Sequence, residues 1–97
     1  MKSPKPIRWN SDKNLELQRE RSISFDEILL AMEGGGELAR TNHPNHEKYP
    51  HQKVLYVNYR NYVYIVPYVE TDDEVFLKTV IPSRKATKYY LTGVIDE

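Results

Sequence analysis

Apolar side chains near the N-terminus recur at helical spacing, and polar residues mark where the helix begins. Residues 7–9 are expected to form a short strand. Asn10 and Ser11 are good N-cap residues, and Asp12 in the first turn suits the positive end of the helix dipole. We therefore predict a helix over residues 12–21, whose thin apolar stripe keeps it on the surface.

The start of a second helix is marked more sharply. Residues 24–27, Ser-Phe-Asp-Glu, are a capping box, and Ile23 and Ile28 occupy the two positions of a hydrophobic staple. Apolar side chains then share one helical face until three glycines at 34–36 end the helix. We predict that this helix docks on the core.

From residue 37 the pattern changes from helical spacing to strands. A short strand is predicted over residues 37–41, followed by a loop rich in Pro and Asn over residues 42–51. β-Branched and aromatic residues are concentrated in segments 54–59 and 62–69, and a further strand is predicted over residues 75–81. Short connections between neighbouring strands make the predicted sheet antiparallel.

Turn residues join these strands and begin a last helix. Arg60 and Asn61 suit a tight hairpin, because Asn tolerates a positive φ. Pro67 lacks an N–H group and therefore predicts a sheet edge or a bulge at the end of its strand. Ser83 is a candidate N-cap for a helix that continues to Gly93.

The fold class that follows is α+β, in the order β-α-α-β-β-β-β-α. We predict an antiparallel meander sheet of about four to five strands, packed by two N-terminal helices and one C-terminal helix. Residues 1–6 are expected to be a flexible arm, and residues 7–97 a single domain.

Composition limits the function. The 97 residues contain 14 basic and 14 acidic side chains, so a uniformly positive nucleic-acid surface is not expected, although Arg84, Lys85 and Lys88 form a local basic cluster. The absence of Cys excludes disulfides, thiolate metal sites and cysteine catalysis. No apolar run approaches the roughly 20 residues needed to span a bilayer. We expect a cytoplasmic protein without a membrane partner.

Three short segments resemble a known family. They are Ile-Arg-Trp-Asn-Ser-Asp-Lys at residues 7–13, Ile-Ser-Phe at residues 23–25 and Ile-Pro-Ser-Arg-Lys-Ala at residues 81–86. In BrnT-type toxins of bacterial type II toxin-antitoxin pairs, Phe-x-Trp-Asp-x-x-Lys opens the chain, Val-Ser-Phe begins the second helix and Ile-Ser-Ala-Arg-Lys-Ala precedes the last helix. The chain departs from that pattern at Asn10, where the family has Asp. It departs again at residues 20–22, where the family has Lys-His-Gly.

The resemblance implies a fold like that of the RelE ribonucleases and a toxin that cleaves RNA without a metal or other cofactor. It also implies neutralisation by a ribbon-helix-helix antitoxin, through which alone the protein would contact DNA. Such a reaction needs a base for the 2′-hydroxyl, an acid for the leaving oxygen and cations for the phosphoryl charge.

Candidate site residues follow from these needs. Lys78, Arg84 and Lys85 are expected to hold the phosphoryl oxygens, and His51 to serve in acid-base chemistry, because His titrates near neutral pH. The residues expected to bind RNA are Lys13, Arg21, Lys88 and Tyr90. Arg21 stands at the position of the family's His, where it can bind phosphate but cannot act as a base.

Simpler interpretations exist for several of these features. His43, His46 and His51 have a spacing that suggests metal ligands, but in a loop without Cys we expect a polar segment and no metal site. The strand tyrosines either stack RNA bases or form cross-strand packing pairs. Tyr62 and Tyr64 lie on the more polar face of their strand, the candidate contact for an antitoxin. The alternative function is a non-catalytic module that binds a protein through the sheet face or edge.

Overall fold

The computed structural model describes residues 5–43, 45 and 47–93. The strands and helices in chain order are β1 (Ile7–Trp9), α1 (Ser11–Arg21), α2 (Phe25–Ala31), β2 (Glu37–Asn42), β3 (Gln52–Tyr59), β4 (Tyr62–Glu70), β5 (Val75–Leu77), β6 (Ile81–Pro82) and α3 (Arg84–Thr87). A π-helical turn continues α2 over Met32–Gly36, and another continues α3 over Lys88–Thr92. The predicted α+β class is confirmed. None of the helices in the described ranges is long and apolar enough to cross a membrane.

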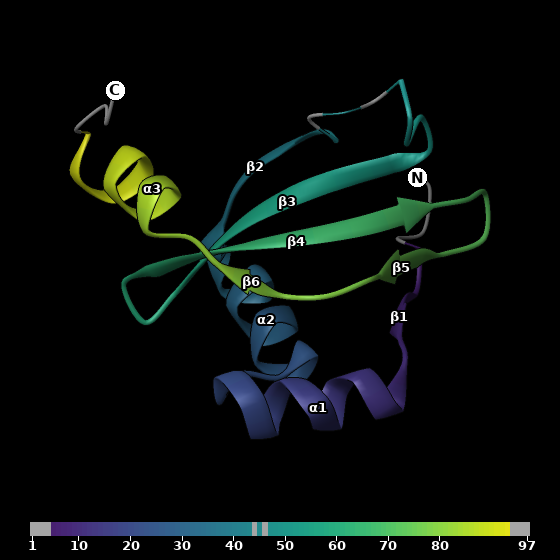
Figure 1. The fold of residues 1–97 in the computed structure, drawn as a ribbon, viewed down its shortest axis with the longest axis horizontal. Coiled ribbons are helices and arrows are strands. Elements are labelled where there is room, and N and C mark those ends of the chain that lie inside the picture. Colours follow the sequence, from purple (N-terminus) through teal and green to yellow (C-terminus); the bar gives the residue numbers. More distant parts are fainter. Residues whose placement is uncertain (1–4, 44, 46, 94–97) are drawn as a thin grey trace.

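The strands form one sheet in the order β1-β5-β4-β3-β2, with β6 paired to β4 beyond β5. Figure 1 shows α1 and α2 together on one side of the strands, and α3 at the opposite end of the sheet from β1. The prediction of a wholly antiparallel sheet is wrong, because β1 pairs with β5 in parallel. The two helices and three strands separate β1 from β5 along the chain, so no tight turn imposes an antiparallel pairing.

The segment predicted as one strand over residues 75–81 is two short strands, and β4 is an interior strand and not an edge. The carbonyl of Pro67 accepts a hydrogen bond of 2.8 Å from the Lys78 N–H. The nitrogen of Pro67 faces the same side of β4 as its carbonyl, which is the side of the break between β5 and β6. Since a proline lacks an N–H donor, this break is where a central strand can accept it without losing a ladder bond.

Local capping signals set the helix boundaries as predicted. The side chain of Asn10 accepts a hydrogen bond from the Lys13 N–H at 3.0 Å, which begins α1. Ser24 and Glu27 form both hydrogen bonds of the capping box that begins α2. Loss of such a cap costs a helix about 1 kcal/mol, so these residues determine where the two helices start.

The core lies between α1, α2 and one face of the sheet. Phe25 and Ile28 of α2 have no exposed surface, and they pack with buried apolar residues of the facing strands. Those strand residues are Leu55, Val57, Val66, Tyr68, Val75 and Leu77. We call this side the core face. It also carries Tyr62 and Tyr64, so the more polar face predicted to meet an antitoxin is the one that the helices cover.

Two backbone features shape the β3–β4 hairpin and its contact with the end of α2. Arg60 and Asn61, with φ of 54° and 62°, form the predicted tight turn between β3 and β4. At the end of α2, a Cβ on Gly36 would lie 2.6 Å from the carbonyl oxygen of Asn58 in β3. Only glycine permits this approach, and the last of the three predicted helix-ending glycines therefore brings the chain directly onto the sheet.

The N-terminal end of the described chain is held to the sheet edge. The Lys5 ammonium donates to the Glu70 carboxylate at 2.9 Å, and the Pro6 carbonyl accepts from the Val75 N–H at 3.0 Å. Residues 1–4 of the predicted arm lie outside the described residues. At this edge, parallel pairing and a side-chain bridge act together to fix β1.

A hydrogen bond between Tyr59 and Glu27 joins β3 to α2. The Tyr59 hydroxyl donates to the Glu27 carboxylate. This bond lowers the pKa of Glu27 below its ordinary value of 4.5 and raises the pKa of Tyr59 above its ordinary value of 10.0. The stability that this bond contributes is fully present between the ordinary pKa of a carboxyl group and the ordinary pKa of a phenol. It is lost as the pH falls through the lowered pKa of Glu27 or rises through the raised pKa of Tyr59.

We predict that Tyr59→Phe lowers the free energy of unfolding at pH 7, because the carboxylate loses its donor. The difference from wild type should shrink as the pH falls through the lowered pKa of Glu27, where the carboxylate is protonated in both proteins. Urea unfolding of both proteins between pH 3 and 7 measures this difference in the free energy of unfolding. Tyr62→Phe, which removes a hydroxyl of the neighbouring strand end, is the control and should show no such pH dependence.

Candidate nucleic-acid interface

The sheet has a second face, which α1 and α2 do not cover. Strand pairing places Arg8 beside Phe76, and Tyr56 beside Ile65, on this side. Apolar and aromatic side chains here stay partly exposed, among them Tyr56, Ile65, Pro67, Val69 and Phe76. We call this side the open face. A half-exposed aromatic surface of this kind is available to a ligand or a partner.

The strands contribute only positive charge to the open face. None of the strand positions that pairing places on this side is Asp or Glu. Arg8 is paired with Glu74 at 3.2 Å, whereas Lys78, Arg84 and Lys85 form no ion pair among the described residues. The Lys78 ammonium instead lies 5.6 Å from the centre of the Phe76 ring. A protein of zero net charge thus has a locally positive, aromatic face.

A pocket of about 380 Å³ lies where α3 meets this face. It is lined by Tyr56, Ile65, Ser83, Lys85, Ala86, Tyr89 and Tyr90. We call it the α3 pocket. Strand alternation provides its floor, because Tyr56 and Ile65 are paired neighbours on β3 and β4, and the α3 segment provides its wall.

Three tyrosines are grouped at the α3 pocket. The Tyr90 ring lies 5.3 Å from that of Tyr56 and 4.8 Å, edge to face, from that of Tyr89. Burial, together with the neighbouring phenols, raises the pKa of Tyr90, so its hydroxyl is protonated at neutral pH and can donate a hydrogen bond. Tyr89 is 53% exposed and offers ring surface to a ligand.

Hydrogen bonds hold α3 against the sheet. The Ser83 hydroxyl accepts from the Ala86 N–H at 3.0 Å, as predicted for an N-cap. The Thr87 hydroxyl accepts from the Val63 N–H at 2.8 Å, and the Val63 carbonyl accepts from the Ser83 N–H. Ala86 is 8% exposed, which lets the helix approach the strand closely. These bonds fix the position of Lys85 and of the tyrosines after it.

Several of the predicted site residues lie together in this region. Lys85 and Tyr90 line the α3 pocket, and Arg84 and Lys88 belong to the same helical segment. Lys78 is on the same side of the sheet but does not line the pocket. Lys78 lies opposite Pro67, and Pro67 is two positions, or about 7 Å along β4, from Ile65 of the pocket.

The other predicted site residues lie elsewhere. His51 precedes β3, five positions or about 17 Å along the strand from Tyr56. Lys13 on α1 pairs with Glu16 at 3.4 Å. Arg21 donates from Nη1 to the Val80 carbonyl at 2.6 Å, which ties the end of α1 to the segment between β5 and β6. The structure gives Lys13 and Arg21 contacts within the fold and does not bring them to the α3 pocket.

Five residues of the pocket lining were not among the sequence candidates for a site: Tyr56, Ile65, Ser83, Ala86 and Tyr89. Ser83 was predicted only as a cap, and Ile65 was assigned no role. Strand alternation is the signal for Ile65, because it shares a face with Tyr56 once the hairpin register is known. Tyr56 is one of the strand tyrosines considered for base stacking, but its grouping with Tyr89 at the pocket depends on how α3 packs.

His43 makes local contacts within the loop between β2 and β3. His43 accepts a hydrogen bond at Nδ1 from the Asn45 N–H, and its ring lies 4.8 Å from that of Tyr49. His46 lies outside the described residues. Within the ranges that the structure describes, no group of three or more His, Cys, Asp or Glu side chains is placed to hold a metal ion.

Comparison with known proteins gives no match. No family model, no curated protein and no solved structure matches the chain. The features that indicate a function are therefore the geometry of the open face and the resemblance of the three short segments.

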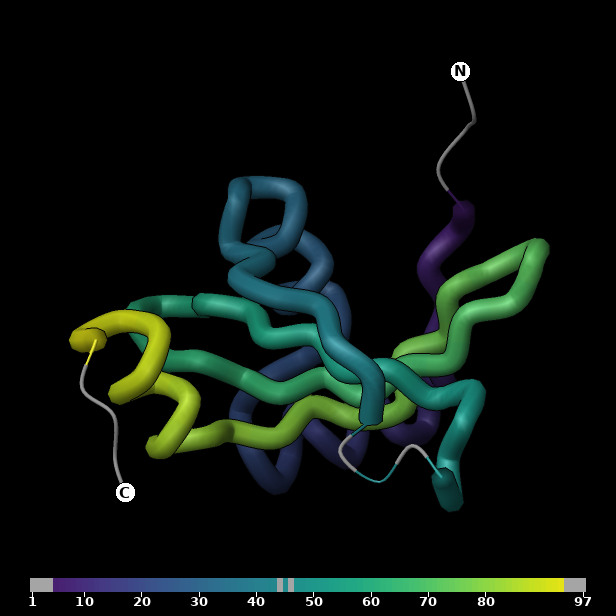
Figure 2. The backbone as a smooth tube through the Cα atoms, turned by 90° about the horizontal axis from the view of Figure 1, so that it is seen from above, coloured from purple at the N-terminus to yellow at the C-terminus, as the bar shows by residue number. Residues whose placement is uncertain are grey.

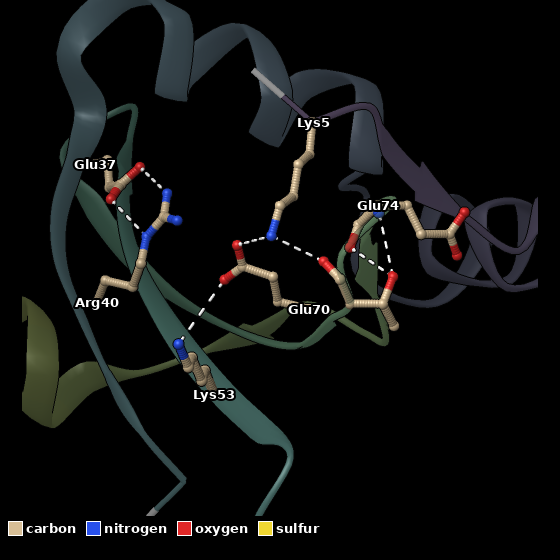
Figure 3. Close-up of polar contacts among 7 residues, drawn as sticks. Lys5, Glu37, Arg40, Lys53, Glu70 and Glu74 are labelled. Atoms are coloured by element: carbon tan, nitrogen blue, oxygen red, sulfur yellow. Dashed lines mark hydrogen bonds and ion pairs between the residues drawn. The ribbon is translucent and has the colours of Figure 1, made fainter. Parts of the chain in front are cut away.

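Charges on the core face beyond the helices are neutralised locally, as Figure 3 shows. Arg40 donates from Nε and Nη2 to the Glu37 carboxylate, at 3.1 and 2.9 Å. Lys5 and Lys53 both approach Glu70, at 2.9 and 3.8 Å. The hydrogen bond from Lys5 holds the pKa of Glu70 below its ordinary value. Because its cations are paired, this cluster is a weaker anion site than the open face.

Tyr68 lies beneath this cluster with an unpaired polar atom. The residue has no exposed surface, and its hydroxyl has no hydrogen-bond partner among the described residues. Burial raises the pKa of this hydroxyl. The Arg40 guanidinium lies 5.6 Å from the centre of the ring.

We predict that Tyr68→Phe leaves the free energy of unfolding unchanged or raises it by up to about 1 kcal/mol, because a buried hydroxyl without a partner costs desolvation energy. Chemical denaturation at pH 7 measures the effect. A loss comparable to that of Tyr59→Phe would show that the Tyr68 hydroxyl has a hydrogen-bond partner in the native protein.

Proposed function

We propose that this chain is the toxin of a bacterial type II toxin-antitoxin pair, which binds single-stranded RNA on its open face and cleaves it without a metal. The observation that carries the RNA-binding part is the joint position of unpaired cations and aromatic rings on one sheet face, whose strand positions carry no Asp or Glu. Single-stranded nucleic acids are bound by this combination, because cations follow the phosphates and rings stack on bases.

The toxin part of the proposal is supported by the resemblance to BrnT-type proteins. The resembling segment at residues 81–86 leads into α3, so it supplies Ser83, Lys85 and Ala86 to the α3 pocket. A ribbon-helix-helix antitoxin would then cover this face in the cytoplasm and provide the only contact with DNA. Lys85 and Arg84 would stabilise charge on the phosphoryl oxygens, and the protonated Tyr90 hydroxyl would donate a hydrogen bond.

The chemistry of the pocket leaves one role open. No carboxylate or imidazole is among the side chains that line it, and His51 is about 17 Å away along the strand. The group that deprotonates the 2′-hydroxyl therefore lies outside the pocket lining, or another surface presents it with the RNA. This observation favours a second candidate, a non-catalytic module. Ile81 and Tyr89, 39% and 53% exposed, would then contact a protein partner.

We predict that inducing the wild-type chain in bacteria arrests growth and that the double variant Arg84→Ala/Lys85→Ala does not, because it lacks two unpaired cations at α3. Colony counts after induction measure the arrest. The matched control is Arg19→Ala/Lys53→Ala, which removes two positive charges outside the open face and should still arrest growth. Circular dichroism first confirms that all three proteins fold.

Each outcome of this comparison distinguishes between the candidates. Arrest by wild type and control alone supports a toxin that acts through the α3 cations. Equal arrest by the double variant contradicts the assigned site. If the wild type causes no arrest, the non-catalytic module is favoured.

Binding of RNA is predicted to depend on salt through the open-face lysines. For a single-stranded oligoribonucleotide, each lysine that contacts a phosphate contributes roughly 0.7 to the slope of log affinity against log salt. Lys78→Ala/Lys85→Ala should therefore weaken binding and flatten the slope by about 1.4. Fluorescence anisotropy at several salt concentrations measures both. If Lys78→Ala/Lys85→Ala has the same slope as the control Arg19→Ala/Lys53→Ala, the RNA does not contact these two lysines of the open face.

A further inference from the structure

The α3 pocket has three properties that restrict its ligand. Its lining is aromatic, because the ring centre of Tyr90 lies 5.3 Å from that of Tyr56 and 4.8 Å from that of Tyr89. One cation, Lys85, stands among its lining residues. No acidic side chain lines it. Its volume of about 380 Å³ falls within the range of small-ligand sites, roughly 300–1,000 Å³.

These properties exclude some ligand classes and favour another. Groups of aromatic rings bind quaternary ammonium ions, but the Lys85 ammonium would repel such a ligand at this site. A purely apolar ligand would leave the Lys85 ammonium without a partner as it excluded water. A flat ring that carries an anionic group satisfies both the aromatic wall and the cation. A nucleotide is a ligand of this class.

The position of Tyr89 indicates how a base would lie. Its ring stands perpendicular to that of Tyr90 and remains 53% exposed, whereas Tyr90 is packed between Tyr89 and Tyr56. Tyr89 and Lys85 are four residues apart along a helical segment, so their side chains lie on one side of it. A base stacked on Tyr89 therefore brings its own phosphate toward Lys85.

We propose that the α3 pocket holds one unpaired base of the bound RNA, stacked on Tyr89, with the adjoining phosphate on the Lys85 ammonium. This inference rests on the proposed RNA binding and deepens it. The rest of the open face contacts the RNA chain without a pocket, while the α3 pocket fixes which nucleotide lies beside α3.

The test uses an RNA decamer with one 2-aminopurine, whose fluorescence is quenched when it stacks on an aromatic ring. Binding of the wild-type chain should change the fluorescence, and Tyr89→Ala should weaken binding by roughly 5- to 100-fold and abolish the change. Tyr89→Phe keeps the ring and should restore both. Tyr49→Ala, which removes a tyrosine of the β2–β3 loop, is the matched control and should behave as wild type.

A second arm separates this inference from the proposed function. Adenosine 3′-monophosphate is titrated into the isotope-labelled chain, and the inference predicts amide shifts at residues around the α3 pocket that Tyr89→Ala removes. If the wild-type chain binds the decamer with the predicted salt dependence, yet Tyr89→Ala changes neither the affinity nor the fluorescence, the pocket assignment fails and RNA binding stands. If the mononucleotide enters the pocket but the decamer does not bind, the pocket assignment stands and the RNA function fails. No binding of either overturns both.

Discussion

The pairing of β3 with β4 is the interaction on which the rest of the structure depends. Eight residue pairs, from Gln52↔Val69 to Tyr59↔Tyr62, form its ladder, and the turn at Arg60 and Asn61 sets the register. Because side chains alternate along a strand, a slip of one residue would exchange the two faces. It would place Leu55 and Val66 in solvent and Tyr56 and Ile65 against α2. The register thus sets both the core and the floor of the α3 pocket.

The two faces of this hairpin divide the charges of a neutral protein. On the core face, Arg40 and Lys53 lie within reach of Glu37 and Glu70, so their charges are largely neutralised where they stand. On the open face the cations have aromatic neighbours and no carboxylates on the strands. Figure 2, which views the molecule from above, shows α3 and the β4–β5 turn at opposite ends of the sheet. A net charge of zero therefore conceals a locally positive surface.

Features that depend on neighbouring residues were predictable. The capping box at Ser24 and Glu27, the N-cap at Asn10, and the tight turn at Arg60 and Asn61 are all decided by contacts within four residues. The cluster of Lys85 and Tyr90 was predictable for the same reason, since they share one helical segment. Ser83 was predictable as a cap but not as a pocket residue, because its place in the pocket depends on how the segment before α3 packs against Tyr56 and Ile65 of the sheet.

Pairings between distant segments were not predictable from local patterns. β1 runs parallel to β5 although some 65 residues separate them, and no turn residue encodes that choice. Arg21, expected to contact RNA, donates to the Val80 carbonyl because α1 ends beside the segment between β5 and β6. His51 was a reasonable acid-base candidate by residue type, but the length of β3 separates it from the pocket. A pattern in sequence identifies the chemistry of a side chain and not its neighbours.

The sequence by itself determined the α+β class, the ends of the helices, the central hairpin and a basic segment before the last helix. Local hydrogen bonds and alternation are sufficient for these, because each involves residues close in the chain. The tertiary structure alone decided which face α1 and α2 cover, which cations remain unpaired and which tyrosines converge. Those properties depend on packing between segments that the chain brings together only on folding, where burial and register outweigh local preference.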